Sequence, residues 1–324
     1  MITCIDAFKN INIVSNNNDV SVSACCLIGA TKVQSLDFEN EPVLTSVRAS
    51  WAAGIFPSNC DPCKKEEASG NISRRQGSNW WYKDQGYDNT DVELIRLDYW
   101  TGDLCNLRCI ICGPGNSSAW KEELKMPTTK VSVNKLWKDL DLSRIKFVHF
   151  NGGEPLLSKE HVEFLKELPN KNTIHINYNT NGTTLPSAEL MALWEQFRLV
   201  QLDFSIDDIG ERFEYQRYPA KWPMIVENLK WFVNNLPHNC IFAVNTSVGK
   251  LNQANIGNLT EWLKINFHSN RFTNPIGLRQ QPVVGRFSLE APLGPAIKFL
   301  NECDARRGTN WQTVFPELVK QSQP

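Results

Sequence analysis

Two features that would link the chain to a membrane are missing from its sequence. No run of about 18 apolar residues occurs, the length at which a helix can span a bilayer. The first residues also lack the basic and apolar regions of a secretory signal peptide. We therefore expect a cytoplasmic protein that has no membrane partner.

An excess of either charge is missing as well. The 34 Lys and Arg residues and the 35 Asp and Glu residues leave a formal net charge of -1 at pH 7. This balance creates no overall field that would attract nucleic acid or an anionic surface. We therefore expect no nucleic acid partner.

Histidine is scarce, with five residues in 324, whereas cysteine is abundant, with ten. In a reducing compartment, clustered thiols are more often metal ligands or catalytic groups than disulfides. Cys240 and Cys303 stand alone, and lone cysteines are usually small buried residues. The other cysteines all lie within the first 112 residues and are the candidates for metal binding.

Composition divides the chain into three predicted parts, 1–86, 87–289 and 290–324. The first part has little apolar sequence, and the alternating residues Val20 to Ala24 after the turn-forming 16–19 predict a small hairpin. Such a part buries too little surface to fold alone, so a metal site that closes it is expected. Residues 70–91 are predicted to be a linker, and the last part is predicted to be a helix and a tail packed on the main domain.

The middle part alternates strand-like runs with helical stretches, which is typical of parallel α/β architecture. The connections have the right length for right-handed crossovers. The predicted strands are 92–99, 146–150, 173–178, 200–205, 240–246 and a weaker one at 277–281. The predicted helices are 117–125, 159–168, 187–197, 223–234 and 255–267.

Three cysteines, Cys105, Cys109 and Cys112, lie on one predicted loop between the first of these strands and a helix. A structural zinc site normally takes four ligands from two paired knuckles, whereas three thiolates on one loop complete only part of a cubane cluster. One iron then keeps an open position and can bind and activate a small molecule. The loop also follows a strand end, where α/β proteins bind ligands.

This Cys-x-x-x-Cys-x-x-Cys loop resembles the hallmark of the radical S-adenosylmethionine (SAM) superfamily. The segment Gly152, Gly153, Glu154 and Pro155 after the second strand is similar to the motif that binds the amino group of SAM in that family. The resemblance implies a partial (β/α)6 barrel. It also implies roles in holding the ribose and carboxylate of SAM for residues in 179–182 and 203–207, namely Asn181, Ser205 and Asp207. Arg217 could pair with the carboxylate of SAM or form a surface salt bridge.

The resemblance also implies a reaction. An electron from the reduced 4Fe-4S cluster cleaves SAM into methionine and a 5'-deoxyadenosyl radical, which abstracts hydrogen from a substrate. The protein then positions the groups and excludes water and oxidants, because the cofactor carries the chemistry. A low-potential flavodoxin or ferredoxin is the implied electron donor.

The remaining clustered cysteines predict a second site. Cys60 and Cys63, with Cys4 and one residue of the pair Cys25 and Cys26, make four thiolates. Adjacent residues of a strand point to opposite faces, so only one of Cys25 and Cys26 is expected to bind. Four thiolates suit either an auxiliary 4Fe-4S cluster or a structural zinc ion, and the ligands alone do not separate the two.

The N-terminal part resembles the twitch domain, a short relative of the cluster-binding SPASM domain, placed here before the radical SAM domain. The similar residues are 54–57, Glu66, Gly70 and 73–75. The resemblance implies an auxiliary 4Fe-4S cluster with Cys25 as the ligand of the pair. Asn and Asp stand where the hairpin turn of that family usually has glycine. The implied roles are electron relay, substrate ligation or structure.

These observations lead to a radical SAM enzyme that modifies a peptide or protein, the substrate class common among relatives with this auxiliary domain. No separate peptide-recognition segment precedes Cys4, which weakens a version with a leader peptide. A small molecule such as a sugar or nucleotide is the alternative substrate. A zinc-bound scaffold protein is the non-enzymatic alternative, and it leaves Glu154 and the paired glycines without a role. A simple electron carrier does not explain a cluster loop with three cysteines.

Overall fold

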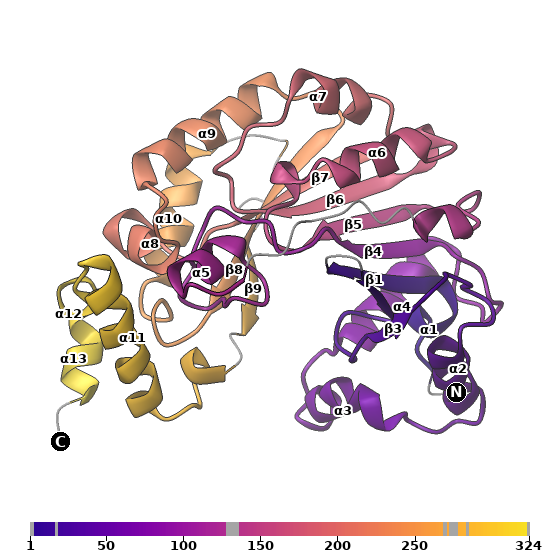
Figure 1. Cartoon of the computed structure of the whole chain (residues 1–324), viewed down its shortest axis with the longest axis horizontal. Coiled ribbons are helices and arrows are strands. Elements are labelled where there is room, and N and C mark those ends of the chain that lie inside the picture. The colour runs from indigo at the N-terminus through magenta and orange to yellow at the C-terminus, as the bar shows by residue number, and fades with distance from the viewer. Residues whose placement is uncertain are drawn as a thin grey trace. The chain divides into compact units, whose positions relative to one another are not determined.

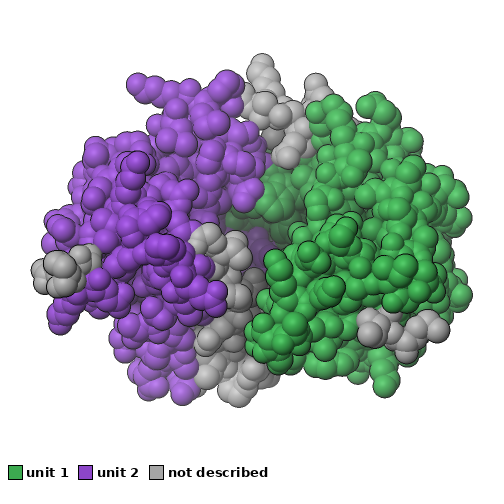
Figure 2. Space-filling view, turned by 90° about the horizontal axis from the view of Figure 1, so that it is seen from below, with its two compact units in different colours: residues 1–102, 129–177, 196–198 green, residues 103–128, 178–195, 199–324 purple. Residues whose placement is uncertain are grey.

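The computed structural model describes residues 3–16, 19–127, 136–267, 271, 278–282 and 285–322. The chain divides into two compact units (Figures 1 and 2). Unit 1 contains residues 1–102, 129–177 and 196–198, and unit 2 contains residues 103–128, 178–195 and 199–324. Among the described residues, no helix has the length and apolar character required to cross a membrane.

The strands of unit 1 form a mixed sheet in the order β3-β2-β1-β4-β5. The strands β1 and β2 pair in antiparallel fashion, with Asn16 opposite Asp19, so the predicted N-terminal hairpin is confirmed. Residues 17 and 18 of its turn lie outside the described residues. The pairs β1–β4 and β4–β5 are parallel, so the hairpin extends the parallel strands of this unit. The bounds are β1 Asn10–Asn16, β2 Asp19–Ser23, β3 Thr31–Val33, β4 Arg96–Trp100 and β5 Phe147–Asn151.

Unit 1 also contains helices, some from residues 1–102 and others from residues 136–177. The α-helices are α1 (Asp6–Lys9), α2 (Pro42–Ala52), α3 (Asp61–Ala68), α4 (Arg74–Asp84) and α6 (Glu160–Glu167). The short 3-10 helices are η1 (Ser58–Cys60), η2 (Leu136–Asp139), η3 (Pro155–Leu157) and η4 (Lys171–Thr173).

The predicted linker at 70–91 is wrong, because helix α4 occupies half of it, Arg74–Asp84. Ser73 begins the helix with a capping box: its Oγ accepts the Gln76 N–H at 3.2 Å, and the Gln76 side chain accepts the Ser73 N–H at 3.0 Å. Tyr82 is fully buried and its hydroxyl donates to the Asp6 carboxylate at 3.1 Å. The polar sequence therefore belongs to a helix that packs on the N-terminal residues.

The strands of unit 2 are parallel, with β8 between β7 and β9. Their bounds are β7 Leu199–Ser205, β8 Cys240–Val248 and β9 Leu278–Pro282, while β6 (His175–Thr180) has residues in both units. The helices are α5 (Ser118–Glu123), α7 (Ala188–Trp194), α8 (Gly210–Gln216), α9 (Trp222–Asn235), α10 (Ile256–Asn266), α11 (Leu293–Arg307), α12 (Trp311–Val314) and α13 (Pro316–Ser322), with the 3-10 helix η5 (Gly285–Phe287).

The six predicted strands correspond to β4 to β9, and the five predicted helices correspond to α5, α6, α7, α9 and α10. Residue 277 of the weakest predicted strand lies outside the described residues. The mixed α/β class with mostly parallel strands is confirmed. Helix α8 was not predicted, and the C-terminal segment forms α11, α12 and α13 where one helix was expected.

The C-terminal helices share a buried apolar cluster with the segment that follows β4. Leu300, Trp311 and Phe315 belong to the same cluster as Ile110 and Trp120. Ile110 lies between the second and third cysteines of the predicted cluster loop. Helices α11 and α12 therefore support this loop within unit 2.

Candidate functional site

The loop that carries Cys105, Cys109 and Cys112 lies in unit 2 and is folded against the start of α5. Ser117 is the N-cap of α5, and its hydroxyl also donates to the Leu107 carbonyl at 2.6 Å. The Cys105 N–H donates to Ser118 Oγ at 3.1 Å, and the Cys112 N–H donates to the Cys109 carbonyl at 3.0 Å. These bonds fix the backbone that presents the three thiols.

A second set of hydrogen bonds holds the same loop to the last residue of α8 and to the segment that follows it. The Arg108 N–H donates to the Tyr218 carbonyl at 2.6 Å, and the Ile110 N–H donates to the Gln216 carbonyl at 2.8 Å. The indole N–H of Trp120 donates to the Cys109 carbonyl at 3.0 Å. The loop is thus hydrogen-bonded on both sides.

Burial is the main influence on these thiols. It raises the pKa of Cys109 well above its ordinary value, and the neighbouring Cys112 and Cys105 raise it further, while Arg217 lowers it. Burial also raises the pKa of Cys112. Because metal ligands must be thiolates, binding of a metal here releases protons.

Arg217 and Asp207 form a buried ion pair beside this loop. The Arg217 Nη2 lies 2.8 Å from the Asp207 carboxylate, and the Arg217 Nη1 lies 4.0 Å from the Cys109 sulfur. The Ser247 N–H donates to the same carboxylate at 2.9 Å. The alternative that Arg217 forms a salt bridge at the surface is therefore wrong, because both partners are buried.

Asn181 follows β6 and bonds to the cysteine loop. Its Nδ2 donates to Asn106 Oδ1 at 3.0 Å and lies 3.9 Å from the Cys105 sulfur, while its Oδ1 accepts the Thr183 N–H at 2.9 Å. Ser205 is the last residue of β7 and is half-buried. Among the predicted SAM-binding residues in unit 2, Asn181 thus contacts the cysteine loop directly. Asp207 contacts it through Arg217.

Gly152, Gly153 and Glu154 follow β5 in unit 1. Gly152 has a φ of 129°, and a Cβ there would lie 2.7 Å from the Gly102 carbonyl oxygen. The Gly153 N–H donates to that oxygen at 2.8 Å. The close approach that Gly152 permits is therefore to the chain's own backbone. Glu154 is buried, and its carboxylate accepts the Leu156 N–H at 3.1 Å.

A second group of thiols meets in unit 1. Cys4, Cys25, Cys60 and Cys63 line one small cavity of about 20 Å³, which we call the four-thiol cavity. Cys4 precedes α1, Cys60 ends η1 and Cys63 lies in the first turn of α3. Three segments that are distant in the sequence, around residues 4, 25 and 60–63, therefore bring their thiols to the same cavity.

The pair Cys25 and Cys26 separates as expected, although for a different reason. Cys25 lines the four-thiol cavity, whereas Cys26 is exposed and does not. Strand β2 ends at Ser23, so the two residues lie in a bend after the strand and the strand alternation that predicted their separation does not apply. The structure brings together the thiols that the sequence grouped, with Cys25 as the member of the pair.

Charged side chains of both signs also line the four-thiol cavity: Asp6, Arg74 and Arg75. Arg74 bridges Asp98 at 2.7 Å and Asp6 at 3.5 Å, and Arg75 pairs with Glu67 at 2.7 Å. Burial raises the pKa of Cys25 to about 12 and the pKa of Cys60 to about 11. Both thiols are therefore protonated near neutral pH, and Arg74 favours the deprotonation of Cys25 that metal binding requires.

Trp51, in the last turn of α2, lines the same cavity. Its side chain is 1% exposed, and its indole N–H has no hydrogen-bond partner among the described residues. A buried donor without a partner costs about 1–3 kcal/mol, so such donors normally have an acceptor. The four thiols are the groups of this cavity whose chemistry fits a metal centre.

Sequence reasoning did not identify Trp51, because a tryptophan on an amphipathic helix is most simply part of the core.

No group of three His, Cys, Asp or Glu side chains within the described ranges is arranged around a single metal-ion position. The donor sets of both sites are sulfur, the ligand type that zinc and iron–sulfur clusters prefer.

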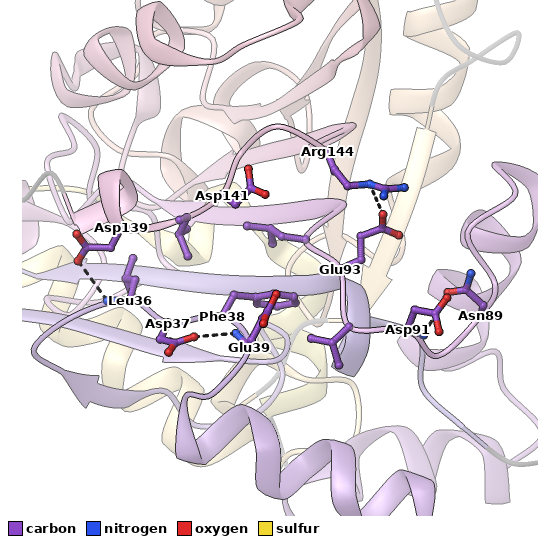
Figure 3. A pocket seen from close by; sticks show the side chains of 13 residues that line it. Leu36, Asp37, Phe38, Glu39, Asn89, Asp91, Glu93, Asp139, Asp141 and Arg144 are labelled. Atoms are coloured by element: carbon purple, nitrogen blue, oxygen red, sulfur yellow. Dashed lines mark hydrogen bonds and ion pairs between the residues drawn. The ribbon is translucent and has the colours of Figure 1, made fainter.

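A larger pocket of about 660 Å³ also lies in unit 1 and contains none of these cysteines (Figure 3). Carboxylates dominate it, but several of them bond to nearby backbone: Asp37 accepts the Glu39 N–H, Asp139 accepts the Leu36 N–H and Asp141 accepts the Ser143 N–H. Glu93 pairs with Lys9 at 3.0 Å and with Arg144. These contacts stabilise the surrounding loops.

Comparisons with known proteins agree with the cysteine loop. Residues 101–260 match the family model described as "Radical SAM superfamily". The chain therefore belongs to the radical SAM superfamily, whose members are enzymes that use SAM and a 4Fe-4S cluster.

Individual relatives match over shorter stretches. GTP 3',8-cyclase of Alkaliphilus oremlandii is 33% identical over 110 residues, which are 33% of this chain and 33% of that protein. 7-Carboxy-7-deazaguanine synthase of Rhodopirellula baltica is 33% identical over 96 residues, 29% of this chain and 35% of that protein. The chain thus spans about a third of the length of these curated relatives. Streptococcus suis SuiB bound to S-adenosylmethionine is 14% identical, with a TM-score of 0.44 over 93% of this chain and 70% of that chain.

Proposed function

We propose that this radical SAM enzyme binds its reactive 4Fe-4S cluster through Cys105, Cys109 and Cys112 and uses it to modify a substrate by hydrogen abstraction. The observation that carries the proposal is the three-cysteine loop, which lies within the stretch matched by the family. When bound, the reduced cluster supplies the electron that cleaves SAM. Three thiolates leave one iron of a cubane open for the cofactor.

The resemblance also assigns residues of this chain that would bind and orient SAM. Glu154 supplies a carboxylate for the amino group of SAM, and the backbone of Gly152 and Gly153 shapes the turn that presents it. Asn181 and Ser205 offer hydrogen bonds for the ribose and the carboxylate. Asp207 acts through Arg217, because its carboxylate already pairs with that guanidinium at 2.8 Å.

For the N-terminal unit we propose an auxiliary 4Fe-4S cluster bound by Cys4, Cys25, Cys60 and Cys63, in a twitch-like module that corresponds to residues 1–86. The convergence of these thiols on one cavity supports a metal centre there. The resemblance to the twitch domain favours a cluster over zinc. The cavity volume of about 20 Å³ favours zinc, because a cubane needs its walls to move apart.

We propose a peptide or protein as the substrate, on the strength of the twitch-like module. A small molecule is the second candidate, because the curated relatives include a GTP cyclase and a deazaguanine synthase. A low-potential flavodoxin or ferredoxin is the proposed electron donor. The reduced state of so many thiols also suits the predicted cytoplasmic location.

Deuterium transfer tests the substrate class directly. An extract from deuterium-labelled cells is divided by ultrafiltration, and each fraction is incubated without oxygen with the reconstituted enzyme, a chemical reductant and SAM. Mass spectrometry then measures deuterium in the 5'-deoxyadenosine formed. Deuterium from the large fraction that disappears after protease treatment supports a peptide or protein, whereas deuterium from the small, protease-resistant fraction supports the small molecule.

The same assay without substrate tests the enzyme itself. Slow reductive cleavage of SAM to 5'-deoxyadenosine is expected for the unaltered chain and for Cys240→Ala, which removes a buried thiol in β8 far from the cysteine loop in sequence. Cys109→Ala is expected to abolish the product. Equal product from Cys109→Ala would contradict the proposed site.

A further inference from the structure

Arg307, the last residue of α11, contacts the cysteine loop with a side chain that is only 3% exposed. Its Nη2 donates to the Arg108 carbonyl at 3.0 Å, and its Nε donates to the Glu123 carboxylate at 3.0 Å. Arg108 directly precedes Cys109 in the sequence. One guanidinium thus joins the C-terminal helix to the backbone of the loop and to the last residue of α5.

Two aromatic rings lie against the same guanidinium. Its central carbon is 4.5 Å from the Trp120 ring centroid and 4.8 Å from the Tyr218 ring centroid. Both aromatic residues also bond to the loop. The Trp120 Nε1 donates to the Cys109 carbonyl at 3.0 Å, and the Tyr218 carbonyl accepts the Arg108 N–H at 2.6 Å. A guanidinium suits this position because it stacks on rings and donates from its edge at the same time.

The two carbonyls that flank Cys109 therefore each accept a side-chain hydrogen bond. The carbonyl before it, from Arg108, accepts from Arg307, and its own carbonyl accepts from Trp120. Because each peptide unit is planar, fixing both carbonyls also fixes the direction in which the Cys109 side chain leaves the backbone. The stretch 101–260 that matches the radical SAM family does not include Arg307, so this contact is additional to the matched part of the chain.

We propose that Arg307 is a positioning residue of the radical SAM site, which holds the Cys109 sulfur in the place that the proposed cluster requires. The inference rests on the proposed binding of that cluster by Cys105, Cys109 and Cys112. Arg307 acts through the loop backbone and through Trp120. Removing a group that orients a metal ligand from behind typically lowers metal affinity by about 10–100-fold.

Arg307→Lys is the informative variant, because it keeps the positive charge but loses the planar fork that serves Glu123 and the Arg108 carbonyl together. Arg306→Lys is the matched control. Arg306 also pairs with Glu123, at 2.9 Å, and its Nη2 lies 3.4 Å from the Cys303 sulfur. The control thus makes the same chemical change at a neighbouring arginine of the same helix, which shares the carboxylate partner.

Two further variants separate positioning from a general loosening of α11. Asp304→Asn weakens the attachment of this helix to α8, because Asp304 accepts the Tyr215 hydroxyl at 2.8 Å. Trp120→Phe keeps an aromatic ring in α5 and removes the N–H that bonds to the Cys109 carbonyl. The first variant disturbs the helix and the second disturbs the loop.

The experiment uses the full-length chain, reconstituted with iron and sulfide without oxygen and then mixed with an excess of an iron chelator. Portions taken over time are reduced and mixed with SAM, and electron paramagnetic resonance measures the SAM-sensitive signal that remains. Denaturant unfolding of each metal-free chain measures stability in parallel. Arg307→Lys and Trp120→Phe are expected to lose the signal about tenfold faster than the unaltered chain. Arg306→Lys and Asp304→Asn are expected to lose it at the unaltered rate, even where unfolding shows lower stability.

Equal rates of signal loss in Arg307→Lys and Arg306→Lys would overturn the inference. A rate in Asp304→Asn as high as in Arg307→Lys would overturn it too, because loosening of α11 would then explain the loss. If the Arg307 variant does not fold, an unchanged rate in Trp120→Phe overturns the inference instead, and a faster rate supports it. Absence of a SAM-sensitive signal from the unaltered chain, by contrast, is a failure of the proposed function itself.

Discussion

The Arg217 guanidinium and the Asp207 carboxylate form a buried ion pair at 2.8 Å, and the same guanidinium lies 4.0 Å from the Cys109 sulfur. The pair joins the end of α8 to the segment after β7. It places a positive charge beside a thiol whose pKa burial raises. A cluster with thiolate ligands is negatively charged, so this arrangement favours the thiolate at Cys109.

Asp207→Asn is expected to destabilise the protein by about 3–5 kcal/mol, because it leaves the Arg217 charge buried without its partner. Denaturant unfolding of the metal-free chain measures the effect. Glu261→Gln, which breaks the exposed pair with Lys264 at 3.9 Å, is the control and is expected to stay within about 0.5 kcal/mol. Normal stability with lost SAM binding would instead make Asp207 a direct ligand of the cofactor.

Gly152→Ala is expected to lower the free energy of unfolding by more than about 1 kcal/mol, even without SAM. The new Cβ would lie 2.7 Å from the Gly102 carbonyl, and a φ of 129° is strained for alanine. Gly294→Ala is the control, because a Cβ there has no heavy atom within 4 Å. If Gly152→Ala unfolds like the unaltered chain, the glycine serves the cofactor alone.

Cys25→Ala is expected to remove the auxiliary cluster and to reduce the iron content of the reconstituted chain by about half, since one of two 4Fe-4S clusters is lost. Cys26→Ala is expected to retain all of the iron, because Cys26 is exposed outside the four-thiol cavity. Iron and sulfide analysis after desalting measures both. A loss of iron from Cys26→Ala but not from Cys25→Ala would exchange the two assignments.

His161 predicts a dependence of stability on pH. Burial lowers the pKa of His161 to about 4, and the Ser158 carbonyl partly opposes this shift. The unfolded chain binds a proton near pH 6.5 and the folded chain does not, so stability is complete above pH 6.5 and falls as the pH decreases toward 4, by roughly 3 kcal/mol in all.

Unfolding free energies between pH 7 and 5 measure this dependence. His161→Asn, which retains a donor for the Ser158 carbonyl, is expected to show a smaller decrease with falling pH than the unaltered chain. His238→Asn, at an exposed position, is the control and is expected to follow the unaltered chain. Identical slopes in all three proteins would show that His161 does not bind its proton differently in the two states.

The parallel part of the fold could be predicted because its strands are apolar runs separated by amphipathic helices. An example is the apolar run 200–205 in β7, which is followed by α9 and then by β8. Helix α4 was missed since its polar, glycine-containing sequence hides the apolar face that buries Tyr82. Its capping box at Ser73 and Gln76 was a usable signal. Cysteine spacing identified both thiol sets, whereas Trp51 could not be found, because only the folded structure shows that its N–H lacks an acceptor among the described residues.

Electron paramagnetic resonance of the anaerobically reconstituted and reduced chain, with and without SAM, tests the central claim most directly. The account predicts a cubane signal that shifts when SAM is added. It also predicts that alanine at Cys105, Cys109 and Cys112 removes this signal while a second, SAM-insensitive signal persists. A folded chain that holds stoichiometric zinc and shows no SAM-sensitive cluster would contradict the account.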